Sequence, residues 1–314
     1  MEAGRSKAED PGARDCIIPR CLAHAGDAPR PMTPDQLDAR LRFAVAAAHR
    51  AGETALAYAR DPAGLGTVSK GVQDVVTAAD KAVEQALRRE IAEAFPGDAV
   101  LGEEEGLSPG WDGRAPLWIL DPIDGTANFA RRLPLWCVSI GVYSDGDAVC
   151  GVIHNPMAGE THAAARGRGA TMNGKPIRVS QATLPEHSRI GLGFSYRRER
   201  KLHVAAVDRL LARQCEYSRL GSGALGMAHV ADGRFEGYFE PHINSWDVAA
   251  GLVIVREAGG FTNDFFARDG LTREQPGVEQ KAPSVPVEEH DQREGSGARR
   301  PRQPADHHDR EPPL

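Results

Sequence analysis

The sequence predicts a protein of mixed helices and strands, in the α+β or α/β class. Segments with apolar residues at helical spacing alternate with short apolar runs that are bounded by turn-forming residues. Most of the strand-like runs fall between residues 100 and 194, with helical segments on either side. The 314 residues are enough for one large domain or two small ones.

The two ends of the chain differ in composition from its middle. Residues 1–31 are rich in Gly, Pro, Ala and charged residues, show no periodicity, and are predicted to be disordered. Met32 is an alternative translation start to Met1, because predicted order begins just after it. Residues 272–314 contain no aromatic residue and few aliphatic ones, so this polar tail is also expected to be disordered. One domain is therefore expected over residues 32–271.

Composition argues against several classes of protein. The net charge of -6 does not favour a nucleic-acid partner. There is no run of 18 apolar residues, and the apolar residues 16–18 are too few for a signal core, so no membrane partner is expected. The five cysteines are scattered without CxxC or paired His spacing, which argues against a zinc site or a disulfide framework. A reducing cytoplasm is the simplest compartment.

Two amphipathic helices are predicted in the first third of the chain. Thr33 to Gln36 form a capping box before the first helix, with Pro34 at its first position. Thr77 or Asp80 can cap the second. An ordinary cap is one interpretation of Asp80; a functional role requires its carboxylate to face other acids. The predicted buried faces are Leu37, Leu41, Val45, Ala48, Gly52 and Leu56 in the first helix, and Val83, Leu87, Ile91 and Phe95 in the second.

The acidic loop Glu103–Glu105 lies between glycines after a short apolar run. Like charges at this density repel one another unless they are solvated or bridged by a cation. A solvated surface loop and a cation site are both compatible with this sequence.

The central stretch runs from Trp118 to Phe129. The apolar run Leu117–Leu120 predicts a short buried strand that ends at Asp121, where an unpaired carboxylate is costly unless something compensates it. Asp124 follows three residues later, so that the two carboxylates can converge. The two acids can bind a hard cation, the N–H groups of Gly125-Thr126 can bind an anion, and the hydroxyl can bind a water. Together these groups suggest metal-assisted phosphate chemistry. An acidic surface turn is the alternative.

Short strands, turns and helices are predicted after the central stretch. Cys137–Val142 and Ala148–Ile153 are expected to pair through a turn at residues 144–147. Residues 173–175 predict a tight turn and residues 190–194 a strand. Residues 221–224 open a predicted helix toward residue 231, whose free N–H groups are available to a polar ligand, although a helix without any ligand has the same sequence pattern.

Asp247 lies in the first turn of an apolar helix that runs to about Ala258. The helix dipole favours an acid there even without a metal. Taken together, however, the acids of the chain supply enough oxygen ligands for two or three Mg²⁺ ions without any His or Cys. These acids are Asp80, Glu103, Asp121, Asp124 and Asp247.

Three ordered motifs resemble the signature of the inositol monophosphatase family. They are Gly102-Glu103-Glu104, the central stretch Trp118–Phe129, and Trp246–Gly251 followed by Glu257-Ala258-Gly259-Gly260. The resemblance covers about Leu37 to Leu271. It implies a layered αβαβα sandwich of the sugar-phosphatase type. It also implies Mg²⁺-dependent hydrolysis of a small phosphate monoester, with inositol 1-phosphate as the expected substrate and a metal-activated water as the attacking group.

The resemblance further implies roles for individual residues. Glu103, Asp121 and the carbonyl of Ile123 would hold one metal ion. Asp121, Asp124 and Asp247 would hold a second, and Glu103 would face a weaker third ion through water.

The same resemblance implies catalytic and substrate-binding roles. Asp80 and Thr126 match the pair that orients the attacking water, with Glu103 as a further catalytic acid. The N–H groups of Gly125 and Thr126 would bind phosphate oxygens. The positions that would touch the hydroxylated ring are Gly221, Ser222, Gly223 and Glu240. A homodimer is an open alternative to a monomer.

The sequence departs from the family after residue 271, where relatives continue with a last strand and helix and this chain continues with the polar tail. Without those two elements the fold would expose an apolar sheet edge. All of the expected metal ligands precede this point, so that the chemistry can survive a loss of stability.

Three alternatives remain. A haloacid-dehalogenase-type phosphatase also carries an Asp-rich motif after an apolar strand, but its two acids lie two residues apart, whereas Asp121 and Asp124 are three apart. The same fold can act on histidinol phosphate, fructose bisphosphate or a nucleotide 3′-phosphate. An inactive, truncated homologue that acts as a binding protein is the non-enzymatic alternative. The retention of every acid argues against it, because an unused acid cluster is repulsive.

Overall fold

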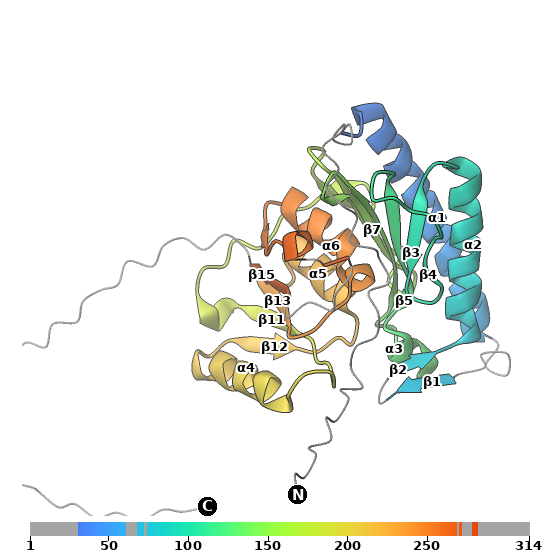
Figure 1. The fold of residues 1–314 in the computed structure, drawn as a ribbon. Coiled ribbons are helices and arrows are strands. Elements are labelled where there is room, and N and C mark those ends of the chain that lie inside the picture. Colours follow the sequence, from blue (N-terminus) through green and yellow to red (C-terminus); the bar gives the residue numbers. More distant parts are fainter. Residues whose placement is uncertain (1–30, 61–67, 72–73, 269, 272–277, 282–314) are drawn as a thin grey trace, which may run out of the picture. The chain divides into compact units, whose positions relative to one another are not determined.

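The computed structural model describes residues 31–60, 68–71, 74–268, 270–271 and 278–281. Within these ranges, helices and strands build the stacked layers of Figure 1. None of the helices in the described part of the chain is long and apolar enough to cross a membrane.

Two helices, α1 (Pro34–Arg60) and α2 (Ala78–Ala94), form the first layer. The predicted capping box at the start of α1 is confirmed, because the Thr33 N–H donates to Gln36 Oε1 at 2.9 Å and the Gln36 N–H donates back to Thr33 Oγ1 at 3.3 Å. Thr77 caps α2 as predicted, with Asp80 as the reciprocal partner. Both helices bury their apolar faces in one core cluster with the first large sheet.

The second layer is an eight-stranded sheet in the order β10-β9-β8-β7-β6-β5-β3-β4. Only β3 and β5 pair in parallel; the other neighbours are antiparallel. The predicted hairpin is β6–β7, and its turn residues Asp145 and Gly146 both have positive φ. The strands are β3 (Ala99–Gly102), β4 (Gly106–Leu107), β5 (Leu117–Asp124), β6 (Cys137–Ser144), β7 (Asp147–Asn155), β8 (Glu160–Ala165), β9 (Ala170–Met172) and β10 (Lys175–Pro176).

The middle layer consists of α5 (Gly223–Ala231) and α6 (Ser245–Glu257), which pack against the other face of this sheet. Two strand glycines allow α6 to approach closely. A Cβ atom on Gly151 would lie 2.3 Å from the carbonyl oxygen of Ala250, and one on Gly141 would lie 2.7 Å from Cβ of Ala249. The start of α6 lies beside the end of β5, because the Ser139 hydroxyl donates to the Trp246 carbonyl at 3.3 Å and Ser139 pairs with Asp121.

The fourth layer is a five-stranded sheet in the order β12-β11-β13-β15-β14, and α4 (Arg200–Ala212) packs on β12 as the fifth layer. The expected αβαβα sandwich is thus confirmed. The strands are β11 (Arg189–Leu192), β12 (Glu216–Ser218), β13 (Gly237–Glu240), β14 (Phe261–Thr262) and β15 (Val278–Lys281). Short elements complete the described fold: β1 (Val68–Gly71), β2 (Asp74–Val76), α3 (Thr126–Ala130) and 3₁₀ turns at Pro185–His187 and Phe266–Arg268.

Strand β15 lies inside the tail that composition predicts to be disordered. It pairs antiparallel with both β13 and β14 and so closes the space between them. Backbone pairing to two neighbours needs no apolar side chains, so a polar segment can form this strand. The rest of the tail and residues 1–30, including Met1, lie outside the described residues. Met32 is described, but the choice between the two start sites and the boundary at residue 271 stay predictions.

Candidate functional site

The end of strand β5 places two acids on one side of the sheet. The sequence predicts that this strand stops at Asp121, but the strand continues to Asp124. Its pairing with β6 is irregular there: Asp121 faces Ser139 while Asp124 faces Cys137, so that β5 holds one residue more than β6. Such a bulge redirects the side chains beside it. The bulge is fixed by the Ile123 N–H, which donates to Asp121 Oδ1 at 3.0 Å.

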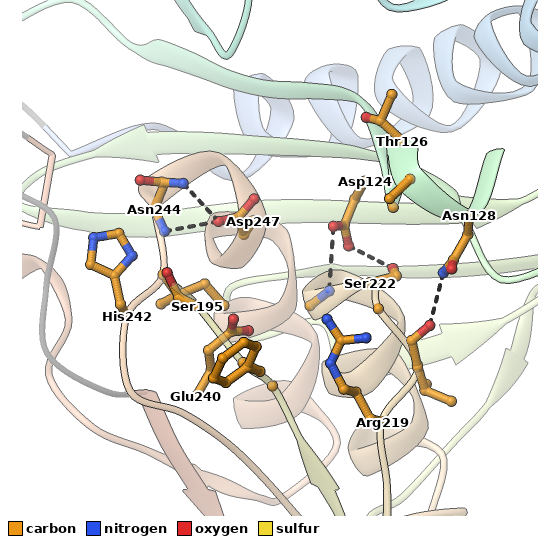
Figure 2. A pocket seen from close by; sticks show the side chains of 18 of the residues that line it. Asp124, Thr126, Asn128, Ser195, Arg219, Ser222, Glu240, His242, Asn244 and Asp247 are labelled. Atoms are coloured by element: carbon orange, nitrogen blue, oxygen red, sulfur yellow. Dashed lines mark hydrogen bonds between the residues drawn. The ribbon is translucent and has the colours of Figure 1, made fainter. Parts of the chain in front are cut away.

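Three carboxylates from two different elements converge at this point. Asp121 and Asp124 come from β5 and Asp247 from the first turn of α6, and one oxygen from each lies within 4.8 Å of the others. Asp247 also completes a capping box, because Asn244 donates to its Oδ2 from the main chain at 2.8 Å and from the side chain at 3.2 Å (Figure 2). Asp247 therefore caps the helix, and its role as a metal ligand, with which this cap is compatible, stays a prediction.

The N-terminus of α5 holds Asp124. The Ser222 hydroxyl donates to Asp124 Oδ2 at 2.7 Å (Figure 2). The Ala224 N–H also donates to Oδ2, at 2.6 Å, and the Gly223 N–H donates to Oδ1 at 3.3 Å. The sequence is compatible with a ligand at these N–H groups; two of them instead bind an acid of the same chain. Ser222 and Gly223 still line the cavity described below, and their contact with a substrate stays a prediction.

The electrostatics of the cluster favour a bound cation. Burial, followed by the charges of Glu103, Asp124 and Asp247, raises the pKa of Asp121 well above its ordinary value. Burial and the Asp124 charge raise the pKa of Asp247 to about 8. Carboxylates held together at such a cost, with oxygen as the only ligand type, fit a hard divalent cation such as Mg²⁺.

Asp80 and Thr126 meet beside this cluster although 46 residues separate them. The Thr126 hydroxyl lies 2.9 Å from Asp80 Oδ1 and 2.9 Å from the carbonyl oxygen of Ile123. Oδ2 of Asp80 accepts from the N–H and hydroxyl of Thr77 at 2.8 and 2.6 Å. Burial raises the pKa of Asp80 in spite of these bonds. Asp80 is thus both a helix cap and a member of the predicted catalytic pair.

The backbone conformation at the start of α3 requires a glycine at position 125. Its φ of 98° lies in the left-handed region, and a Cβ atom would lie 2.9 Å from the carbonyl oxygen of Leu135. This turn places the Thr126 hydroxyl within hydrogen-bond distance of Asp80. Glu103 approaches the same site from the loop after β3, and its charge is the largest charge effect on Asp121, although it lies outside the three-acid group.

A cavity of about 1040 Å³ opens over the acids. Its far wall carries Glu240, whose carboxylate accepts a hydrogen bond from the Tyr238 hydroxyl. Burial raises the pKa of Glu240 to about 7. Figure 2 shows Glu240, Ser222 and Asp124 around the same space. Residues of the lining that sequence analysis missed include Arg219, Tyr238, His242 and Asn244.

Only one of these missed residues had a usable signal. Asn244 precedes Asp247 by three residues, the spacing of a capping box, which could have marked it. Arg219 and His242 lie in loops and no local pattern distinguishes them. Of the predicted residues, Asp80, Glu103, Asp121, Ile123, Asp124, Gly125, Thr126 and Asp247 gather at the end of β5, and Gly221, Ser222, Gly223 and Glu240 line the wall of the cavity.

Comparison with known proteins identifies a family that matches most of the chain. The model of the inositol monophosphatase family matches residues 36–293. A protein from Xylella fastidiosa named Nus factor SuhB is 37% identical over 237 residues, which are 75% of this chain and 85% of that protein. An inositol-1-monophosphatase from Mesorhizobium japonicum is 38% identical over 228 residues, covering 72% and 85% of the two chains.

Solved structures show the same similarity. The extragenic suppressor protein suhB from Bartonella henselae has a TM-score of 0.72 and 32% identity, covering 77% of this chain and 93% of its own. An inositol monophosphatase from Anabaena has a TM-score of 0.68 and 35% identity, covering 79% and 92%. The matched segment, the layered fold and the acid cluster at the end of β5 together show that this chain belongs to the inositol monophosphatase family.

Proposed function

We propose that this protein is a Mg²⁺-dependent phosphatase that hydrolyses inositol 1-phosphate to inositol and phosphate. Family membership supports a phosphatase acting on small phosphate monoesters. The observation that carries the proposal is the convergence of Asp121, Asp124 and Asp247 beside the Asp80–Thr126 pair. The related protein from Mesorhizobium japonicum that is named inositol-1-monophosphatase supports the substrate.

The proposed ligands of two or three Mg²⁺ ions are Glu103, Asp121, the Ile123 carbonyl, Asp124 and Asp247. Bound Mg²⁺ would stabilise negative charge on the phosphate oxygens and lower the pKa of a water molecule. The chain itself supplies the orientation: hydrogen bonds from Ser222 and α5 hold Asp124, and those from Asn244 hold Asp247.

The Asp80–Thr126 pair is proposed to position the attacking water. The Thr126 hydroxyl can donate to Asp80 or to the Ile123 carbonyl, and its oxygen can then accept a hydrogen bond from water. Asp80 is buried and its pKa is raised, which makes it a better proton acceptor than a solvated acid. The N–H groups of Gly125 and Thr126 are proposed to bind phosphate oxygens, since both residues line the cavity.

The ring of the substrate is proposed to contact residues 221–223 and Glu240. The side chain of Glu240 lies against the backbone of Gly193, where a Cβ atom would come within 2.2 Å of a carboxylate oxygen. A carboxylate held in this way can accept hydrogen bonds from adjacent sugar hydroxyls. Histidinol phosphate, fructose bisphosphate and a nucleotide 3′-phosphate remain the alternative substrates.

Replacing Glu240 by Gln is expected to change the pH dependence of substrate binding. The pKa of Glu240 is raised to about 7, so that its ionised fraction grows as the pH rises from about 6 to 8. Because hydrogen bonds to a charged acceptor are stronger by about 1 kcal/mol, we expect the KM of the wild type, relative to the variant, to fall by up to about fivefold over that range.

The measurement is KM against pH for both proteins, with the Mg²⁺ requirement as the control. The variant should also shift the preference among the four substrates more than it shifts the Mg²⁺ requirement. A large change in Mg²⁺ requirement with unchanged preference would mean that Glu240 belongs to the metal site instead.

The proposed activity is tested by phosphate release from inositol 1-phosphate, histidinol phosphate, fructose bisphosphate and a nucleotide 3′-phosphate. We expect release to depend on Mg²⁺ and to be fastest with inositol 1-phosphate. Faster release from another substrate would keep the chemistry and correct the substrate. No release from any of the four, by a folded chain, would reject the proposal.

A role outside catalysis is the second candidate, because several relatives at 37% identity bear the name Nus factor SuhB. In a strain that lacks its own copy, a variant without phosphatase activity distinguishes the two. If the inactive variant restores the phenotype of the deletion, a non-enzymatic binding role is favoured. If only active protein restores it, the phosphatase is what the cell requires. Cytoplasmic location and homodimer formation also remain proposals, which fractionation and light scattering can test.

A further inference from the structure

We propose that Glu84 is a positioning residue that sets the affinity of the metal site by holding the acidic loop Glu103–Glu105. The inference rests on the proposed function, since it concerns the metal site of the proposed phosphatase. Glu84 lies on α2, it is fully buried, and it is not among the acids that converge on Asp121.

The carboxylate of Glu84 binds the two residues that follow Glu103. Its Oε2 accepts from the Glu104 N–H at 2.8 Å and its Oε1 from the Glu105 N–H at 3.0 Å. Consecutive N–H groups that point at one carboxylate fix the direction of the peptide planes, and therefore the direction in which the preceding side chain leaves the loop.

The residue before Glu103 is fitted to the same carboxylate. A Cβ atom on Gly102 would lie 2.2 Å from Glu84 Oε1, so that no other residue fits at this position without moving Glu84. The N–H of Glu103 itself donates to the Leu120 carbonyl at 3.2 Å, one residue before Asp121. Glu103 is thus held between a buried carboxylate on one side and strand β5 on the other.

Arg88 balances the charge of Glu84 and extends the same contact. Its Nε donates to Glu84 Oε1 at 2.8 Å, one helical turn away, and its Nη2 donates to the carbonyl oxygen of Gly106 at the far end of the loop. The negative charge behind the loop is therefore paired within α2. Glu103 has the largest charge effect on Asp121.

A buried ion pair such as Glu84–Arg88 contributes little to stability by itself. Its main effect is therefore to orient the acidic loop Glu103–Glu105. Some residues orient the metal ligands through hydrogen bonds but do not bind the metal themselves. Replacing such a residue typically lowers metal affinity by about 10- to 100-fold. Glu84→Gln keeps the size of the side chain but puts an NH₂ group against one of the two loop N–H groups. We expect this change to swing Glu103 away from Asp121.

The test is Mg²⁺ binding to the full-length chain by calorimetry, without substrate. We expect the Kd for Mg²⁺ to rise by about 10-fold or more in Glu84→Gln. The matched control is Glu90→Gln on the same helix, which removes the partner of the exposed Arg50 and should leave the Kd unchanged. In kinetics, the Mg²⁺ concentration for half-maximal activity should rise in parallel, while kcat at saturating Mg²⁺ changes less.

An unchanged Kd in folded Glu84→Gln would overturn the inference. If Glu84→Gln does not fold, Glu84→Asp is measured in its place. The Asp variant keeps the negative charge that pairs with Arg88 and only withdraws the carboxylate from the loop. The same rise in Kd would support the inference and an unchanged Kd would reject it. If the wild type binds Mg²⁺ but hydrolyses no phosphate monoester, the proposed function fails while the Kd comparison still decides the role of Glu84. A wild type that binds no Mg²⁺ would reject both.

Discussion

Asp121→Asn is expected to abolish turnover and, at the same time, to stabilise the metal-free protein. Asp121 is the acid that both proposed metal sites share, so the amide weakens them together. A metal ion contributes several kcal/mol to stabilising transition-state charge, which corresponds to a loss of about three orders of magnitude in kcat or more. The gain in stability has the opposite origin, because the change removes one of several like charges that are buried together.

The sign of the pH dependence follows from the direction of the pKa shift. The pKa of Asp121 in the folded protein is raised above the value of about 3.9 in the unfolded chain, so the folded state holds the proton to a higher pH. The metal-free wild type therefore loses stability as the pH rises from about 4 toward the raised pKa. The Asn variant lacks this group, and its stability should depend less steeply on pH over that window.

Thermal unfolding in a chelator and in Mg²⁺, at several pH values, measures both effects, and phosphate release measures the activity. Mg²⁺ should raise the midpoint of the wild type and leave that of Asp121→Asn unchanged. Asp112→Asn, at an exposed loop position, is the matched control and should behave as the wild type does. Near-normal turnover in a folded Asp121→Asn protein would refute the proposed metal site.

The parts of the fold that the sequence predicts are those with local causes. The caps at Thr33 and Thr77 and the turn at Asp145-Gly146 need only neighbouring residues, and all three are confirmed. The end of β5 was misplaced because a bulge depends on the partner strand, which local spacing does not reveal. Strand β15 was missed for a similar reason, since its pairing with β13 and β14 depends on strands far away in the chain.

The acids of the site were predictable one by one, whereas their supporting contacts were not. Asp121 and Asp247 stand in motifs that resemble the family. The helix that holds Asp124 is recognisable in the sequence, but its N–H groups could equally have faced a ligand. Glu84 has an Arg four residues later, which is the pattern of an ordinary surface ion pair. Only the three-dimensional structure shows that it is buried beneath the acidic loop.

Asp98→Ala is expected to be among the most destabilising single changes outside the site. Both carboxylate oxygens of Asp98 bind Arg40, at 2.7 and 2.8 Å, and the indole N–H of Trp118 donates to it at 2.8 Å. The two charged side chains are 11% and 5% exposed. Removing one partner leaves a largely buried guanidinium without its counter-charge, which typically costs about 3–5 kcal/mol. The guanidinium also lies 4.7 Å from the ring centre of Phe95, so that it cannot turn to water without losing that contact.

Urea unfolding of Asp98→Ala and of the matched variant Asp38→Ala measures the difference. Asp38 pairs with Arg168 where the side chains are 35% and 45% exposed, and such a pair contributes about 1 kcal/mol or less. A double variant, Arg40→Met with Asp98→Ala, removes the stranded charge and should recover part of the stability that Asp98→Ala loses. If the double variant is no more stable than the single one, the loss comes from the Trp118 hydrogen bond and from packing, and the charge of Arg40 is not its cause.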